Sequence, residues 1–140
     1  MYAKSINEGF ARSTIAAFVC GLDPTIEELC DIKTAVSEAV TNCIVHAYEK
    51  NASGNGLIYI DAKYDQEGLL TVKIRDKGCG IENVKKALEP MYTGSKSDER
   101  SGMGFSIMQC FTDKMSVKSS VGKGTTVILK KYIGKSVGNE

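Results

Sequence analysis

The polar residues with the clearest chemical potential share one face of a predicted helix. Glu38 and Asn42 are four residues apart, as are Asn42 and His46, so the three side chains stack along one side. The amide oxygen of Asn42 is a ligand that suits Mg²⁺. A carboxylate one turn earlier can take a proton from a hydroxyl that attacks a phosphate. The same spacing also fits a plain solvent-facing stripe, and His46 by itself fits helix packing.

A second group follows a predicted strand, in a segment that contains the pattern D-x-G-x-G. Asp76 stands at the strand end and can accept hydrogen bonds from an exocyclic amine such as that of adenine. Gly78 and Gly80 would let the backbone approach a flat ligand closely. The bare pattern is weak, because many turns have this composition. These residues alone are therefore compatible with a nucleotide-base pocket and with a simple turn.

Two glycines stand at a predicted helix start, after a long polar loop over residues 90–101. Gly102 and Gly104 would offer backbone N–H groups to an anion at the positive end of the helix dipole. Lys96 and Arg100 supply cations beside them, and the small polar residues of the loop are typical of a mobile lid. The Walker pattern is absent, and an ordinary glycine-rich helix start is the alternative.

Two helices are predicted ahead of the first strand. Ser5 and Glu8 fit a capping box for the first helix. The second helix has two possible caps, Asp23 with a proline after it or Thr25 with a glutamate three residues on, and it should end near Tyr48.

The rest of the chain reads as strands and two further helices. Alternating residues predict strands over 57–64, 69–74, 115–120 and 125–132, with a G-K-G turn before the last, and helical segments over 84–88 and from 102 onward. Because short turns join consecutive strands, we expect an α+β fold. It should be a two-layer sandwich whose antiparallel or mixed sheet carries the helices on one face.

Composition sets the broad class of the protein. The chain has 140 residues, 42% hydrophobic and 25% charged, which suits one domain with its own core. We expect that domain over residues 1–133 and a disordered tail over 134–140. The net charge of +1 argues against direct, broad electrostatic binding of nucleic acid. No apolar run reaches the length of a membrane span.

The cysteines point to a reducing compartment. There are five of them and none forms C-x-x-C, which disfavours a disulfide framework or a zinc site and suits the cytoplasm. Cys79 lies between two glycines. The others are expected to pack on helices as small hydrophobes; they are Cys20, Cys30, Cys43 and Cys110.

The order of the motifs is more specific than any one of them. E-x-x-x-N on a helix, D-x-G-x-G after a strand, a polar loop ending in G-x-G and a final G-T-T resemble the Bergerat-fold ATPases, which include gyrase B, Hsp90, histidine kinases and MutL. Within that group the chain is similar to the anti-sigma F family of sporulating bacteria, whose members are serine kinases. The similarity runs from about Ser5 to Tyr132, through Glu8–Arg12, Leu22–Thr25, Val36–Asn42, Ile74–Asp76 and Glu99–Phe105.

The resemblance implies catalytic roles for three of the matching residues. Asn42 would hold Mg²⁺ against the phosphates of ATP. Glu38 would act as the general base on a serine of a partner protein. Arg100 would offset the charge that develops on the γ-phosphoryl group.

The resemblance also implies a nucleotide pocket for ATP or ADP. Asp76 would bind adenine, with Thr125 supporting it. The remaining members of the pocket shape its adenine end or hold phosphate oxygens; they are Gly78, Gly80, Lys96, Gly102 and Gly104.

Two protein partners are implied in the same way. They are sigma F, which would be bound and inhibited, and an anti-anti-sigma factor, which would be phosphorylated on serine. Glu8 and Arg12 match positions where the family docks partners, and they fit solvent-facing charges equally well. The family state is a homodimer formed with the help of an N-terminal strand, which is shortened here to Met1–Lys4.

Two other functions are compatible with the fold. The alternative is a nucleotide-gated binding module without significant kinase activity, because both kinds of protein use the same pocket. A histidine kinase domain is disfavoured, because the chain has one histidine, His46, and it lies in the nucleotide helix.

Overall fold

The computed structural model describes residues 1–48, 56–89 and 99–134, and for residues 99–103 the backbone alone. Four strands form one sheet in the order β1-β2-β4-β3. They are β1 (Ile58–Tyr64), β2 (Leu69–Asp76), β3 (Lys114–Ser120) and β4 (Gly124–Tyr132). All three pairings are antiparallel, which confirms the expected α+β fold and decides between the antiparallel and mixed alternatives.

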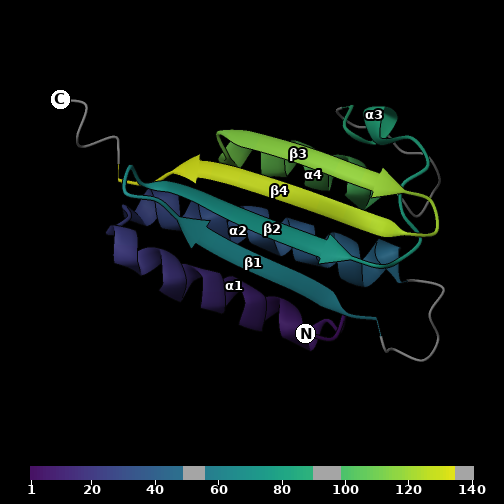
Figure 1. Cartoon of the computed structure of the whole chain (residues 1–140), viewed down its shortest axis with the longest axis horizontal. Helices are drawn as coiled ribbons and strands as arrows, with labels where there is room; N and C mark the ends of the chain where they lie inside the picture. Colours follow the sequence, from purple (N-terminus) through teal and green to yellow (C-terminus); the bar gives the residue numbers. More distant parts are fainter. Residues whose placement is uncertain (49–55, 90–98, 135–140) are drawn as a thin grey trace.

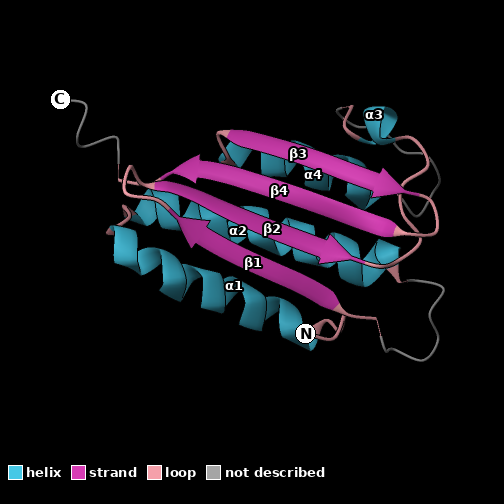
Figure 2. Cartoon of the chain, viewed as in Figure 1, coloured by secondary structure: helices cyan, strands magenta, loops and turns pink. Residues whose placement is uncertain are grey.

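The helices lie on one face of this sheet. Figure 1 shows α1 (Ile6–Val19), α2 (Ile26–Asn42) and α4 (Glu99–Phe111) side by side behind the strands. Figure 2 shows the opposite face of the strands uncovered by any described helix. The short α3 (Val84–Ala87) lies near β3 and α4. No helix in the described part of the chain is long and apolar enough to cross a bilayer.

The core lies between the two layers because residues alternate along the strands. In β2, Leu70, Val72 and Ile74 are buried against the helices, while Lys73 and Arg75 point to the open face. The helices contribute a matching apolar stripe that includes Ile32, Val36, Ala39, Val40, Phe105 and Met108. Burial of these side chains holds the polar end of α2 against the strand ends.

The two predicted capping boxes, at Ser5 and at Thr25, differ in the structure. Thr25 caps α2: the Glu28 N–H donates to Thr25 Oγ1 over 3.0 Å, and the Thr25 N–H donates to Glu28 Oε1 over 2.9 Å. The prediction for Ser5 is wrong, because its side chain makes no cap bond. Ser5 has helical φ and ψ of −56° and −31° rather than the extended backbone that a cap requires.

Three other expectations need revision. Only Cys43 of the four helix cysteines is buried, and the other three are exposed. Helix α4 begins at Glu99, earlier than the predicted start at Gly102. Gly134, expected in a disordered tail, donates its N–H to the Glu28 carboxylate over 3.0 and 3.1 Å. Residues 135–140 lie outside the described part of the chain.

Candidate functional site

The predicted acid and amide of α2 lie together beneath α4. Gly104 is buried, and a Cβ added to it would lie 3.3 Å from both Asn42 Oδ1 and Glu38 Oε2. The backbone of α4 therefore approaches both functional side chains directly. The absence of a side chain at this position keeps Glu38 and Asn42 in place.

Asn42 carries an unused hydrogen-bond donor. Its Nδ2 atom is buried and has no hydrogen-bond partner in the described structure. Leaving a buried amide nitrogen unsatisfied costs roughly 1–3 kcal/mol, so such an atom calls for an explanation. An anionic ligand beside Asn42 would supply the missing acceptor.

The predicted helix changes form directly after Asn42. The residues from Cys43 to Ala47 form a π-helical turn instead of continuing α2. The carbonyl of Ala47 accepts the N–H of Cys79 over 2.9 Å. Wide turns of this kind are frequent at functional sites, and this one joins the Asn42 end of α2 to the Asp76 loop.

Asp76 is buried and holds its carboxylate in a fixed orientation. Its side chain accepts the N–H groups of Gly78 and Thr125 at Oδ1 over 2.9 and 3.2 Å. The Cys43 thiol donates to Oδ2 over 3.5 Å. The residue is 5% exposed, so this acceptor-only group faces a small, shielded region.

Cys43 is a site residue that sequence reasoning assigned to packing alone. It follows Asn42 in the chain and touches Asp76, so it connects the two halves of the site. Burial, together with the charge and hydrogen bond of Asp76, raises the pKa of the Cys43 thiol well above its ordinary value of 9.0. The thiol therefore stays protonated and remains a donor at neutral pH.

The glycines of the Asp76 loop serve backbone packing. A Cβ at Gly78 would collide with the carbonyl of Ala47, and a Cβ at Gly80 would collide with the carbonyl of Ser120. Gly80 also has a φ of +77°, which favours glycine. The loop is therefore clamped between the π-helical turn and the β3–β4 turn.

Thr125 takes part in a hydroxyl network that the sequence did not reveal. Its Oγ1 lies 2.7 Å from the Oγ of Ser119, and Ser119 Oγ accepts the N–H of Ile81 over 2.7 Å. A serine in an alternating strand gives no signal of such a role. The network ties Thr125 to the end of the Asp76 loop.

Tyr48 is a second residue that sequence reasoning missed. Its hydroxyl donates to the carbonyl of Leu57 over 2.6 Å and accepts the N–H of Lys77 over 2.6 Å. Burial raises the pKa of the Tyr48 hydroxyl above its ordinary value. The side chain thus joins the end of the π-helical turn to the strand ends beside Asp76.

The predicted phosphate-binding residues are only partly described. Gly102 is the fourth residue of α4 and closes its first turn, whose leading backbone N–H groups have no partner within the helix. Gly104 lies two residues further along, where its N–H falls within the hydrogen-bond ladder of the helix. The structure describes only the backbone of Arg100, and Lys96 lies outside the described residues.

Glu8 and Arg12 lie one turn apart on α1 and pair with each other. Arg12 Nη1 donates to Glu8 Oε1 over 3.1 Å. The side chains of Arg12 and Glu8 are 41% and 24% exposed. They form a partly exposed ion pair on the helical layer.

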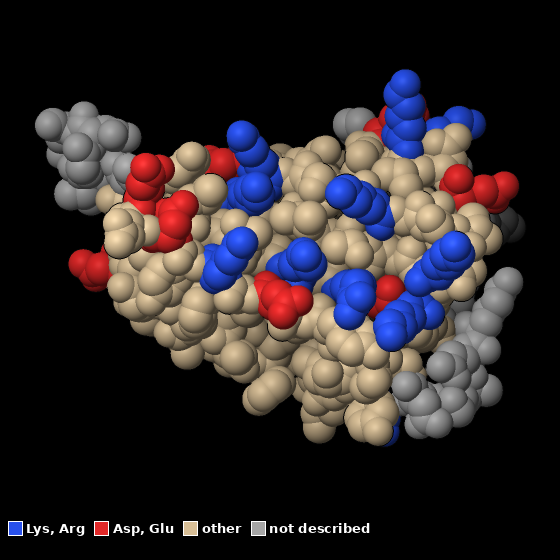
Figure 3. All heavy atoms as spheres, viewed as in Figure 1, with Lys and Arg blue, Asp and Glu red and all other residues tan. Residues whose placement is uncertain are grey.

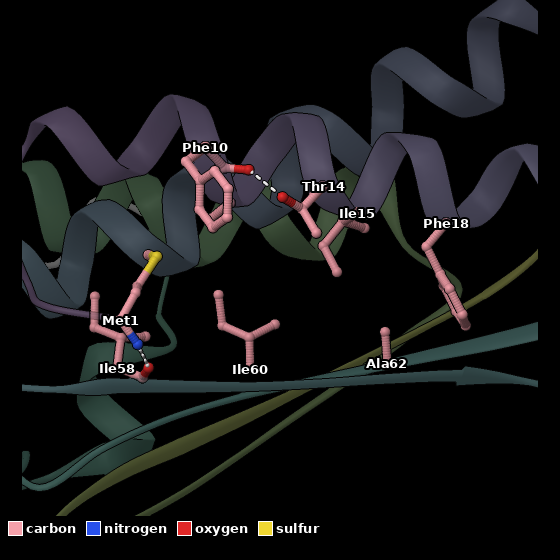
Figure 4. Close-up of a pocket in the computed structure, with 9 residues that line it drawn as sticks. Met1, Phe10, Thr14, Ile15, Phe18, Ile58, Ile60 and Ala62 are labelled. Atoms are coloured by element: carbon pink, nitrogen blue, oxygen red, sulfur yellow. Dashed lines mark hydrogen bonds between the residues drawn. The ribbon is translucent and has the colours of Figure 1, made fainter.

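A separate groove lies between α1 and β1. Figure 4 shows Phe10 and Phe18 of α1 facing Ile60 and Ala62 of β1 across it. Its volume is about 320 Å³, and the described residues that line it include no charged side chain. None of the predicted site residues that the structure describes lines this groove, so it does not suit a nucleotide phosphate.

The described contacts form one continuous site. Gly104 contacts Glu38 and Asn42, Cys43 follows Asn42 and reaches Asp76, and Asp76 binds the backbone of Thr125. A fixed carboxylate acceptor thus stands at one end. A helical carboxylate and an amide with an unsatisfied donor stand at the other. This arrangement can bind the base of a ligand at one end and its anionic groups at the other.

Comparison with protein families identifies the class of protein. Residues 6–131 match the model of the histidine kinase-like ATPase domain, which covers most of the chain. The chain is also similar to a blue-light activated histidine kinase of Erythrobacter litoralis EL346. The TM-score is 0.62 and the identity 22%, over 83% of this chain and 34% of that one. The structural likeness supports the fold, and the family match supports nucleotide binding of the ATPase and kinase type.

Curated relatives narrow this class. The anti-sigma F factor of Caldanaerobacter subterraneus subsp. tengcongensis is 53% identical, over 96% of this chain and 91% of that protein. The anti-sigma F factor of Geobacillus thermodenitrificans is 53% identical, over 96% and 90%. That of Clostridium beijerinckii is 52% identical, over 92% and 88%. The chain belongs to the anti-sigma F factor family of histidine kinase-like ATPase domains.

Proposed function

We propose that this protein is a Mg-ATP-dependent protein serine kinase that binds and inhibits sigma F and phosphorylates an anti-anti-sigma factor. The observation that carries the proposal is the close approach of Gly104 to Glu38 and Asn42, in a site that continues through Cys43 to Asp76. Family membership supports the anti-sigma and kinase-type function.

Adenine binds at the Asp76 end of the site. Asp76 accepts the exocyclic amine of the base, because its ionised carboxylate has acceptor sites and no donor. The Cys43 and Thr125 contacts hold that carboxylate still. Gly78 and Gly80 keep the loop close to the π-helical turn and so shape the pocket wall.

The phosphates and the metal bind at the Asn42 end. The Asn42 amide oxygen is the protein ligand to Mg²⁺, which commonly uses one or two protein oxygens and the substrate phosphates. The buried, unpaired Asn42 Nδ2 supports an anion at this place. Lys96, Arg100 and the first-turn N–H of Gly102 bind phosphate oxygens. When bound, Mg-ATP supplies the γ-phosphoryl group, and its metal ion offsets the negative charge of that group.

Glu38 acts on the acceptor hydroxyl. Its carboxylate lies one helical turn before Asn42, beside the same glycine of α4. It orients the serine hydroxyl of the partner and takes its proton as the hydroxyl oxygen attacks the γ-phosphorus of ATP, whose bond to the bridging oxygen breaks to release ADP. Gly104 serves this step by leaving room for the carboxylate.

Protein partners bind on the helical layer and near the phosphate end. We assign the Glu8 and Arg12 pair on α1 to partner contact, because it presents both charges on a partly exposed helix face. The partners are sigma F and the anti-anti-sigma factor, in the cytoplasm. A homodimer is the functional state that the family resemblance favours.

The decisive experiment combines transfer and binding. Glu38→Gln should lower phosphorylation of the anti-anti-sigma factor by roughly 10²–10⁴-fold, while ATP affinity measured by calorimetry stays near the parental value. The matched control is Glu27→Gln, an exposed acid on the same helix, which should change neither. Parental transfer by Glu38→Gln contradicts the base assignment. Nucleotide-dependent capture of sigma F without any phosphoserine would favour the binding-module alternative.

A further inference from the structure

The open face of the sheet carries mostly positive charge. Residues that alternate with the core positions point away from the helices, and the strand register sets them in rows. One row runs Lys63, Thr71, Lys130 and Lys114, and another runs Tyr59, Arg75, Thr126 and Lys118. Figure 3 shows blue side chains spread over this face. Among the described strand positions on it, Asp61 is the one acidic residue.

Positive charge gathered on one face destabilises the sheet unless a bound partner offsets it. Lys114 and Lys130 are directly opposite each other in the β3–β4 register, and like charges in that position destabilise a sheet. A mixture of signs would keep the face equally soluble. The net charge of +1 is therefore reached through acidic residues elsewhere, and it conceals a strongly basic face.

Part of the face is hollowed where β2 ends and the β3–β4 turn begins. The described residues that line this hollow, which has a volume of about 510 Å³, include four cations, Arg75, Lys77, Lys118 and Lys123. Asp76 and Thr125 of the candidate nucleotide site line it as well. The hydroxyl residues Ser120 and Thr126 also line it. The Arg75 guanidinium and the Lys77 ammonium lie 4.7 and 5.2 Å from the ring centroid of Tyr59. The hollow thus combines positive charge, hydroxyl groups and an aromatic ring at its border.

The composition of the face selects the kind of partner. Protein–protein interfaces are depleted in lysine, whereas lysine is a common partner of phosphate. Flat antiparallel sheets with aromatic and basic side chains suit single strands, whose bases and phosphates are both accessible. We propose that this face binds single-stranded nucleic acid through its phosphate backbone.

The proposed surface adjoins the nucleotide site, because Asp76 and Thr125 also line the hollow. Asp76 is buried among the residues facing the helices, while its neighbours Arg75 and Lys77 are exposed. The two sites therefore meet at the end of β2. Lys114 and Lys130 lie on the open face outside the hollow, so their replacement leaves the residues around Asp76 unchanged.

The test measures binding of fluorescein-labelled oligothymidine by anisotropy at several salt concentrations. Four phosphate contacts, three of them made by Lys114, Lys118 and Lys130, predict a slope of about −3 in log K against log[salt], or roughly a 50-fold loss between about 50 and 200 mM salt. The variant Lys114→Gln/Lys118→Gln/Lys130→Gln should flatten the slope by about 2. Lys4→Gln/Lys85→Gln/Lys86→Gln, with the same charge change at exposed positions off the sheet, should leave it unchanged.

Three outcomes overturn the proposal. The first is binding that is absent or independent of salt. The second is an equal loss in both triple variants, which means that net charge alone is responsible. The third is displacement of the oligonucleotide by poly-L-glutamate as readily as by unlabelled oligothymidine, which assigns the face to acidic proteins. Circular dichroism and ATP calorimetry on each variant separate these outcomes from misfolding and from failure of the nucleotide site.

Discussion

At the scale of single residues, the site depends on small groups that hold larger ones in place. Cys43 has no charge and lies in the core, yet its thiol is the donor to Asp76 Oδ2. Gly104 has no side chain, yet its position decides where Glu38 and Asn42 can lie. Both residues act through their neighbours and are positioning residues.

A series at Cys43 tests the first of these roles. Cys43→Val replaces the thiol with a slightly larger apolar side chain and removes the donor, so Asp76 loses a buried partner worth about 1.5–3 kcal/mol. ADP affinity measured by calorimetry should fall about tenfold or more. Cys43→Ser restores a donor and should bind within a few-fold of the parent. An unchanged affinity in Cys43→Val would mean that the hydrogen bond has no influence on adenine binding.

The same thiol predicts an alkaline limit to stability. Its folded-state pKa lies above its unfolded value, so the stabilising contribution is complete below about pH 9 and is lost as pH rises toward the folded pKa. The free energy of unfolding, measured by denaturant titration, should therefore fall above pH 9 at up to about 1.4 kcal/mol per pH unit from this group. Cys43→Val should lack this component. If the free energy of unfolding falls with pH in the same way in the parent and in Cys43→Val, the thiol is not the cause.

Gly104→Ala separates packing at the site from stability of the fold. The added methyl would lie 3.3 Å from Asn42 Oδ1 and Glu38 Oε2 and displace them. Phosphorylation should fall at least about tenfold, since small misplacements are costly to transfer. The free energy of unfolding should change by less than about 1 kcal/mol, because alanine favours helices.

Gly9→Ala is the matched control for this variant. A Cβ there would meet only the Arg12 guanidinium, at an ordinary 3.8 Å. It should stabilise α1 by about 0.5–1 kcal/mol and leave phosphorylation unchanged. Full activity in Gly104→Ala would show that the close approach of α4 has no role in catalysis.

At the scale of elements, helix ends decide how the site is presented. Helix α2 starts at a reciprocal cap and ends in a π-helical turn that binds the Asp76 loop. Glu28 of the cap also accepts the N–H of Gly134 after β4. The start of α2 is therefore joined to the end of the sheet.

The cap gives a prediction with an internal control. Thr25→Ala removes the side-chain acceptor for the Glu28 N–H and should lower the free energy of unfolding by about 1 kcal/mol. Ser5→Ala should cost only a few tenths, because the Ser5 side chain makes no cap bond. Chemical denaturation of both variants measures the difference. Equal losses would contradict the assignment of the cap to Thr25.

At the scale of the whole molecule, the contact between the helical layer and the sheet joins the two ends of the candidate nucleotide site. Asn42 belongs to the helical layer and Thr125 to the sheet, and Asp76 at the end of β2 is bonded both to Thr125 and to Cys43, which follows Asn42. A ligand that spans both should stabilise the entire fold by mass action.

Thermal unfolding with nucleotide tests this expectation. ADP with Mg²⁺, present at about 100 times its dissociation constant, should raise the free energy of unfolding by about 2.7 kcal/mol. Chelation of Mg²⁺ should remove part of that gain in the parent and none in Asn42→Ala. GDP should give little stabilisation, because guanine has a carbonyl oxygen where adenine has its exocyclic amine. That oxygen would face the Asp76 carboxylate, which only accepts hydrogen bonds. Equal stabilisation by GDP would exclude the proposed role of Asp76.

The sequence by itself determined the elements and the identity of the main polar groups. The spacing of Glu38 and Asn42 and the alternation in the strands are local, and local periodicity follows from backbone geometry. The wrong cap at Ser5 and the exposed Cys20 are errors of the same local reasoning, because exposure depends on what packs nearby.

The tertiary structure alone decided which small residues share the site and which face is charged. Cys43 meets Asp76 although they are 33 residues apart, and the π-helical turn forms where the distant Cys79 loop binds it. The basic face likewise depends on strand order, since a total charge of +1 carries no information about where charges gather. Contacts between distant segments arise only when the layers pack, so no local pattern in the chain records them.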